Sequence, residues 1–141
     1  DTLALDPQVT LTILSPEPMF RGAGDNAASL VLELSAWDRR VLLTGDLEAD
    51  GLAHFLAVPG PRVDVLQAPH HGAVAANTVD LERRTVPAWV WVSGGRNETV
   101  DRLRSIYPTA EAILTARDDG ALTATISRDG QLRISSFGKG P

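Results

Sequence analysis

Short runs in which apolar and polar residues alternate recur along this chain, separated by segments whose apolar residues have helical spacing. Residues 9–14 alternate threonine with apolar residues, which is the pattern of a half-buried strand. Further strands are predicted at residues 29–34, 40–43, 63–66, 88–92, 112–115, 121–127 and 132–135. Helices are predicted at residues 47–56, 79–84 and 99–107. Strands and helices in this order predict a mixed α/β fold that is rich in strands.

Turn residues join some of these elements directly. Ala36-Trp37-Asp38 stands between the predicted strands at 29–34 and 40–43, and Arg128-Asp129-Gly130 stands between the last two strands, so both pairs of strands are predicted to be hairpins. The helix at 47–56 follows Asp46, which is a residue type that often caps helix N-termini. Asp46 is therefore predicted to be the N-cap of this helix.

Composition narrows the classes of function. At 141 residues and 43% hydrophobic content, the chain is long enough for one domain with a buried core. The formal net charge of −5 excludes a basic field over the whole domain that would attract nucleic acid. The absence of cysteine excludes disulfides and thiolate metal sites. No apolar run approaches the roughly 20 residues of a membrane span, so a soluble domain is expected.

Two segments carry the candidate chemistry, residues 42–48 (LLTGDLE) and residues 65–72 (VLQAPHHG). In each, a predicted buried strand ends at residues that bind metals or move protons, Asp46 in the first and His70 and His71 in the second. Ligands of α/β sheets bind at the carboxyl ends of strands, so we expect these three side chains to converge at one edge. Carboxylate oxygen and neutral imidazole are suitable ligands for zinc or manganese.

Each candidate also has a purely structural interpretation. Asp46 could serve only as a helix N-cap, a role worth about 1 kcal/mol. His70 and His71 could be a loop pair whose backbone hydrogen bonds are satisfied. We favour the ligand role for Asp46, because a helix cap does not require the Leu-Leu-Thr-Gly run that precedes this residue. We also favour a ligand role for one of the two histidines, without a choice between them. His54, the third histidine, lies within a predicted helix and is expected to face solvent.

Several segments occur in a recognisable order: residues 26–32, 43–46, 69–72 and 93–97, then Thr115 and residues 120–121. In this order and spacing the chain, from about residue 9 to residue 135, resembles the metallo-β-lactamase-like domain at the C-terminus of ComEC/Rec2 competence proteins, which are inner-membrane DNA-uptake channels. The resemblance implies an α/β fold of α+β layers, a metallo-β-lactamase-like αββα sandwich of which this chain would be the C-terminal half. The domain would span residues 1–136, followed by a flexible tail at residues 137–141.

The resemblance also implies roles for the site residues. Asp46 corresponds to a metal ligand that often bridges two ions, and His70 or His71 corresponds to a ligand from the second half of the fold. Asn97 matches a family asparagine, but the Gly-His-Pro segment that usually follows is absent, and Ala73 stands where the family usually has serine. Both departures weigh against catalysis.

The first metal motif of the fold, of the His-x-His-x-Asp-His type, has no counterpart here, since no histidine precedes His54. A hydrolytic zinc site typically has three protein ligands and a water, whereas Asp46 and one histidine supply two. We therefore expect this chain to be the second half of a domain from a longer protein. Alone, it is expected to bind no metal stably and to leave phosphodiesters intact. A half-domain would also expose an apolar sheet face, so self-association is expected.

Three functions follow from these expectations. In the first, the intact parent is a zinc- or manganese-dependent nuclease that degrades one DNA strand while the other enters the cell. In the second, the domain is a degenerate, non-catalytic module that assists or regulates DNA transport. The third, less favoured, is a small-molecule metallo-hydrolase such as a lactonase or a phosphorylcholine esterase. The implied partners are the missing N-terminal half of the domain, the membrane channel of the parent, and DNA. The implied location is a soluble domain of an inner-membrane protein, with the side of the membrane left open.

Overall fold

The computed structural model of the chain describes residues 1–94 and 97–138. The strands are β1 (Thr2–Asp6), β2 (Val9–Ser15), β3 (Val31–Ala36), β4 (Arg39–Leu43), β5 (Val65–Gln67), β6 (Trp89–Val92), β7 (Ala112–Thr115), β8 (Ala121–Ile126) and β9 (Leu132–Phe137). The helices are α1 (Ala49–Ala57), α2 (Val79–Thr85) and α3 (Asn97–Ile106), with two single 3-10 turns, η1 (Asn26–Ala28) and η2 (His70–Gly72). Over these residues, no helix combines the length and the hydropathy needed to cross a bilayer.

Seven strands form one mixed sheet in the order of the sequence, from β1 to β7. β1 to β4 are antiparallel neighbours, and the predicted hairpin between β3 and β4 is present. Its turn consists of Trp37 and Asp38, both with positive φ, whereas Ala36 of the predicted turn belongs to β3. β4 to β7 are parallel, and each step between them passes through one of the three helices. These parallel strands therefore end at the same edge of the sheet.

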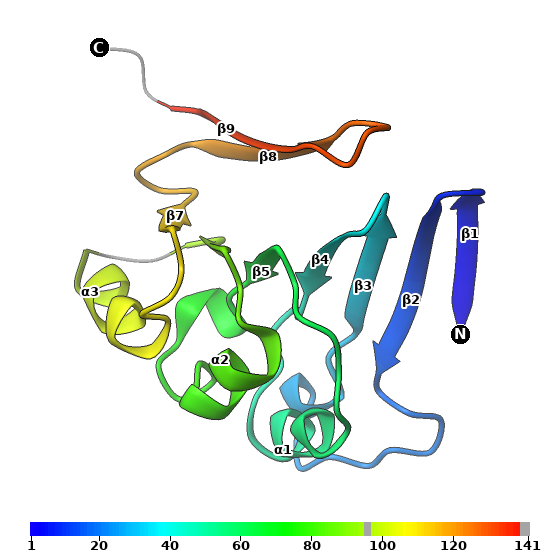
Figure 1. Ribbon diagram of the computed structural model, residues 1–141. Helices are drawn as coiled ribbons and strands as arrows, with labels where there is room; N and C mark the ends of the chain where they lie inside the picture. The colour runs from blue at the N-terminus through cyan, green and yellow to red at the C-terminus, as the bar shows by residue number, and fades with distance from the viewer. Residues whose placement is uncertain (95–96, 139–141) are drawn as a thin grey trace.

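The molecule is layered. The three helices cover one face of the sheet, and the separate β8–β9 hairpin lies across the other face (Figure 1). The main core lies between the sheet and the helices and includes the buried residues Leu42, Leu66, Val90, Leu52, Phe55, Leu81 and Leu103. The layered α/β class predicted from the sequence is confirmed, while the finer assignment to a metallo-β-lactamase-like sandwich stays a prediction.

On the face away from the helices, the alternation of side chains along the strands places a second row of apolar residues. Leu3 and Ile13 belong to this row and are 59% and 40% exposed, and Leu43 is also exposed. We call Leu3, Ile13 and Leu43 the open face. The β8–β9 hairpin lies across part of this side, next to Leu43. Arg39 contacts the hairpin tip by donating from Nε to the carbonyl oxygen of Gly130 (2.8 Å).

Two local features differ from the prediction. The sequence pattern does not predict β1, because all of its residues are exposed and it is held by pairing with β2 rather than by burial. The prediction that Asp46 caps α1 is wrong, since the helix begins at Ala49 with Glu48 as its N-cap. Asp46 lies in a preceding turn, in which the N–H of Leu47 donates to the carbonyl oxygen of Thr44 (3.2 Å).

The segment predicted as a tail begins within a strand, because Phe137 ends β9 and pairs with Ala121. Residues 139–141, with their predicted flexibility, lie outside the described residues. In the family-like segment at 93–97, Gly95, Arg96 and the side chain of Asn97 likewise lie outside them. The proposed domain boundaries therefore stay predictions.

Candidate functional site

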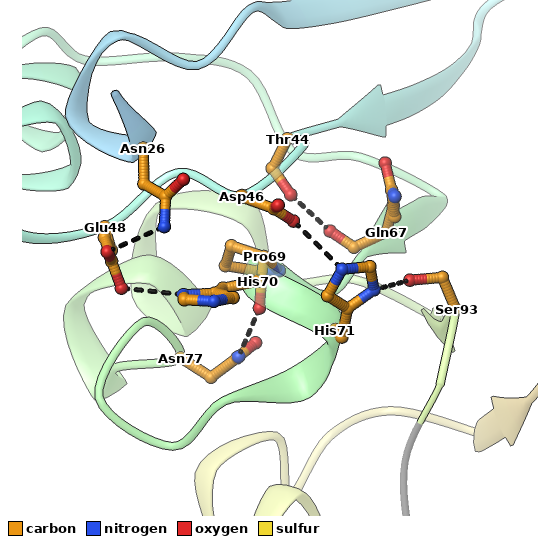
Figure 2. Close-up of polar contacts among 10 residues, drawn as sticks. All are labelled: Asn26, Thr44, Asp46, Glu48, Gln67, Pro69, His70, His71, Asn77 and Ser93. Atoms are coloured by element: carbon orange, nitrogen blue, oxygen red, sulfur yellow. Dashed lines mark hydrogen bonds and ion pairs between the residues drawn. The ribbon is translucent and has the colours of Figure 1, made fainter. Parts of the chain in front are cut away.

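The two candidate segments meet where the parallel strands β4 and β5 end. Thr44, directly after β4, donates from Oγ1 to the carbonyl oxygen of Gln67, the last residue of β5 (2.8 Å). The N–H of His70 donates to the carbonyl oxygen of Gly45 (3.0 Å). These hydrogen bonds cross-link the two segments and bring the residues singled out from the sequence to one edge of the sheet (Figure 2).

His71 lies between Asp46 and Ser93 (Figure 2). Its Nε2 atom is 3.4 Å from Oδ1 of Asp46, and its Nδ1 atom is 2.7 Å from Oγ of Ser93. The three residues follow three neighbouring parallel strands, β4, β5 and β6. The serine hydroxyl fixes the ring through one nitrogen, so the other nitrogen is directed at the carboxylate.

His70 has a different partner. Its Nδ1 atom is 2.7 Å from Oε2 of Glu48, whose other carboxylate oxygen accepts from Nδ2 of Asn26 (2.9 Å). The hydrogen bonds from Asn26 and then from His70 lower the pKa of Glu48, because both favour the ionised carboxylate. An ionised carboxylate can only accept, so the hydrogen of the neutral His70 ring lies on Nδ1 and its lone pair lies on Nε2.

The two rings diverge because the backbone between them is left-handed. His70, His71 and Gly72 have φ values of 48°, 53° and 82°, and we call these three residues the histidine turn. Such a conformation costs about 1 to 3 kcal/mol for a residue with a side chain, and it persists where the surroundings enforce it. As a result the two imidazoles stand 6.2 Å apart at 63° to each other, one facing Glu48 and the other facing Asp46.

The Asp46–His71 pair fits a shared divalent ion. Two ligands of one tetrahedral zinc ion, each about 2.0 to 2.2 Å from it, lie roughly 3.3 to 3.5 Å apart. The observed 3.4 Å matches this separation, whereas a charge-assisted hydrogen bond would measure about 2.7 to 2.9 Å. Among the residues that the structure describes, no group of three or more His, Asp or Glu side chains is arranged to hold a metal ion.

His54 lies apart from this site, on α1. Its ring packs against that of Phe20 with centroids 4.9 Å apart, and its Nε2 atom is buried at 3.6 Å from Oε2 of Glu17. The expectation of a solvent-facing histidine is therefore right for only part of the side chain. The loop between β2 and η1 covers the rest, which the helical pattern alone could not reveal.

Some residues at the site carried no role in the sequence analysis. Glu48 had a usable signal, because it is a second carboxylate two positions after Asp46 in the same segment. Ser93 also had one, since it directly follows a predicted strand. Asn77 and Tyr107, which hydrogen-bond beneath the histidine turn, have no such signal and become visible only in the fold.

Comparison with known proteins adds an independent observation. No protein-family model matches the chain. It is 34% identical over 86 residues to ComE operon protein 3 of Bacillus subtilis, which covers 60% of this chain and 11% of that protein. It is 37% identical over 84 residues to Recombination protein 2 of Haemophilus influenzae, covering 60% of this chain and 10% of that protein. The chain resembles the ComEC/Rec2 proteins.

The ComEC/Rec2 resemblance that the sequence motifs indicated is thus supported by two curated relatives from different bacteria. The chain spans only about a tenth of the length of either relative. What the complete ComEC/Rec2 proteins do therefore bears on this chain only as a proposal.

Proposed function

We propose that this chain is part of the metallo-β-lactamase-like domain of a DNA-uptake channel protein, and that the intact parent is a metal-dependent nuclease. One observation carries the proposal, the 3.4 Å separation of Asp46 Oδ1 and His71 Nε2 at the carboxyl ends of β4 and β5. The similarity to ComE operon protein 3 and Recombination protein 2 supports the assignment to a ComEC/Rec2-like parent.

In this proposal Asp46 and His71 are two ligands of a zinc or manganese ion, and residues of the parent outside this chain complete the set. Ser93 holds Nδ1 of His71 so that its Nε2 faces the carboxylate. Glu48 keeps the hydrogen of His70 on Nδ1, which leaves Nε2 of that ring as a proton acceptor at the same edge. When bound, the ion supplies Lewis-acid chemistry, polarising a phosphoryl oxygen and lowering the pKa of water.

The partners in this proposal are DNA, the N-terminal half of the domain and the membrane channel of the parent. The location is a soluble domain attached to an inner-membrane protein. Two alternatives make different predictions for the experiments below. A non-catalytic module would bind DNA or the channel without using the site, and a small-molecule metallo-hydrolase would use the site on another substrate.

The ligand pair can be tested with Mn²⁺, which broadens the NMR signals of nearby nuclei even when it binds weakly. Signals of Asp46 and His71 should broaden first, and Asp46→Ala or His71→Ala should weaken binding by at least about tenfold. His54→Ala is the matched control, because this histidine lies outside the site, and it should leave the broadening unchanged. An absence of broadening at His71 at millimolar Mn²⁺ would contradict the assignment of the ligands.

Nuclease function is tested in two proteins. The 141-residue chain with zinc or manganese should leave a phosphodiester substrate intact, because it holds only part of the ligand set. Appreciable cleavage by this chain would show that the half-domain proposal is wrong. In the complete parent, Asp46→Asn should abolish degradation of the DNA strand. Normal degradation by that variant would favour the non-catalytic alternative.

A further inference from the structure

The direction in which His71 points depends on the strained backbone of the histidine turn. Two backbone hydrogen bonds close this turn, from Gly72 N–H to the carbonyl oxygen of Pro69 (3.1 Å) and from Ala73 N–H to that of His70 (2.9 Å). Three consecutive residues with positive φ, of which two carry imidazole side chains, form an uncommon and strained arrangement. The turn begins after Pro69 and ends before Ala73. Side chains that hold these two ends therefore help to set the direction in which the two imidazoles leave the backbone.

One buried side chain contacts both ends. Nδ2 of Asn77 donates to the carbonyl oxygen of Pro69 (3.1 Å) and to that of Ala73 (2.8 Å) (Figure 2 draws the first of these contacts). A side-chain amide nitrogen has two hydrogens, so each carbonyl receives one. Asn77 is only 2% exposed, and water therefore cannot replace these hydrogen bonds without opening the core.

The acceptor end of the same amide is braced from another element. The hydroxyl of Tyr107, which directly follows α3, donates to Oδ1 of Asn77 (2.9 Å). Tyr107 is itself 2% exposed and belongs to the main core. The amide can therefore neither flip nor swing away, because both of its ends have fixed partners.

We propose that Asn77, braced by Tyr107, is a positioning residue that clamps the two ends of the histidine turn and thereby directs His71 at Asp46. The chemistry requires asparagine. Aspartate of the same shape has no N–H to donate, and glutamine has one methylene group too many for the buried space. The importance of the clamp for metal binding rests on the proposed function, whereas its effect on the turn does not.

The test compares Asn77→Asp and Tyr107→Phe with Thr85→Val as the matched control. Thr85 is also buried, and its hydroxyl donates to the carbonyl oxygen of Leu81 within α2, so the control loses a buried hydrogen bond that does not reach the turn. The readouts are the NMR couplings that report φ at His70 and His71, the imidazole nitrogen shifts, and the broadening by Mn²⁺. Unfolding by urea is measured in parallel.

We expect Asn77→Asp to change the φ-dependent couplings of both histidines and to weaken Mn²⁺ binding at His71 by at least about tenfold. Tyr107→Phe should change the couplings and weaken Mn²⁺ binding to a smaller extent. This variant replaces Asn77→Asp in the test if Asn77→Asp does not fold. Thr85→Val should lower stability without moving the histidine signals. Variants of Asn77 and Tyr107 that lose stability but keep the histidine couplings would overturn the proposal. If Mn²⁺ leaves His71 of the unmodified chain unaffected, the proposed function fails, while the couplings still decide whether the clamp exists.

Discussion

Among single residues, Glu48 has a pKa that two neighbouring side chains lower. Its carboxylate accepts from Asn26 and contacts Nδ1 of His70, and these hydrogen bonds, Asn26 first, lower its pKa below the usual 4.5. Because the pKa is lowered in the folded state, the ionised carboxylate stabilises the fold above pH 4.5. This contribution is lost as the pH falls through the lowered pKa.

Asn26→Ala should therefore raise the pKa of Glu48 towards its usual value, because it removes the largest cause of the shift. The variant should lose free energy of unfolding mainly above pH 4.5, and its difference from the unmodified chain should shrink at lower pH. An NMR titration of the side-chain carboxyl carbons measures the pKa of Glu48 and that of the control residue, Asp129. The pKa of Asp129, lowered by Ser127 on the distant β8–β9 hairpin, is the internal control and should not change. An unchanged pKa of Glu48 would contradict the assigned cause.

The meeting of Asp46 with a histidine was predictable from the sequence, because both residue types follow apolar runs that end at one edge of a parallel sheet. Which of the two histidines faces Asp46 was not predictable. The ring directions follow from the left-handed backbone of the histidine turn, beneath which Asn77 and Tyr107, 30 residues apart, form a hydrogen bond. A pattern read along the chain contains no information about such a contact.

Among the elements, the histidine turn packs closely between β6 and α3. A Cβ atom at Gly72 would lie 2.9 Å from Cγ1 of Val92 and 3.3 Å from Cδ1 of Leu103, and the residue has a φ of 82°. Only glycine satisfies both the space and the backbone conformation. The histidine turn is therefore fixed by its packing against β6 and α3 as well as by hydrogen bonds.

Gly72→Ala should lower the free energy of unfolding by about 2 to 4 kcal/mol, because it combines a strained φ with overpacking. Gly24→Ala is the control for backbone strain without crowding, since Gly24 also has a positive φ but nothing lies within 4 Å of an added Cβ. It should cost about 1 kcal/mol. Urea unfolding curves measure both values. Equal losses in the two variants would mean that crowding at Gly72 contributes nothing.

Arg39 links the tip of the β8–β9 hairpin to the sheet. Arg39 donates from Nε to the carbonyl oxygen of Gly130 and from Nη1 to Oδ1 of Asp64, both at 2.8 Å. Arg39→Met keeps most of the apolar stem but loses both hydrogen bonds, which are worth about 1 kcal/mol each. Amide hydrogen exchange in the hairpin should become about three- to tenfold faster, while exchange in β4 to β6 stays slow.

The control for this experiment is Arg83→Met on α2. Arg83 is exposed, and its Nη1 atom lies 3.2 Å from Oδ1 of Asp80 within the same helix. The same change of side chain there should leave exchange in the hairpin as it is. Hairpin exchange that is equally slow in Arg39→Met would show that apolar packing alone holds the hairpin against the sheet.

Elements with strong local patterns were predictable, and those that depend on distant pairing were not. The strands around the Trp37-Asp38 turn were predictable, since alternation and turn residues coincide there. β1 was not, because its leucines face solvent and only the ladder to β2 keeps it extended. The start of α1 was misjudged at Asp46 because the turn from Thr44 to Leu47 resembles a helix start in sequence.

At the scale of the whole molecule, the two sides of the sheet are covered unequally. The helix side carries the main core, whereas the β8–β9 hairpin lies across the opposite side (Figure 1). On this opposite side the described residues include the open face of Leu3, Ile13 and Leu43, of which Leu43 lies beside β8. Exposed apolar side chains on one face of a sheet favour association, and a net charge of −5 over 141 residues opposes it only weakly. The open face is therefore the surface through which the chain is expected to self-associate.

Leu3→Glu should shift this association towards the monomer, because it places a charge on the open face and removes a leucine whose burial is worth about 1.5 to 3 kcal/mol. The apparent dissociation constant should rise by about tenfold or more. Val79→Glu is the matched control, since Val79 is 49% exposed on α2, on the opposite side of the sheet, and gains the same charge. Analytical ultracentrifugation over a range of concentrations measures the constants. An unmodified chain that stays monomeric at the highest concentration, or an equal effect of both variants, would mean that the open face is not an association surface.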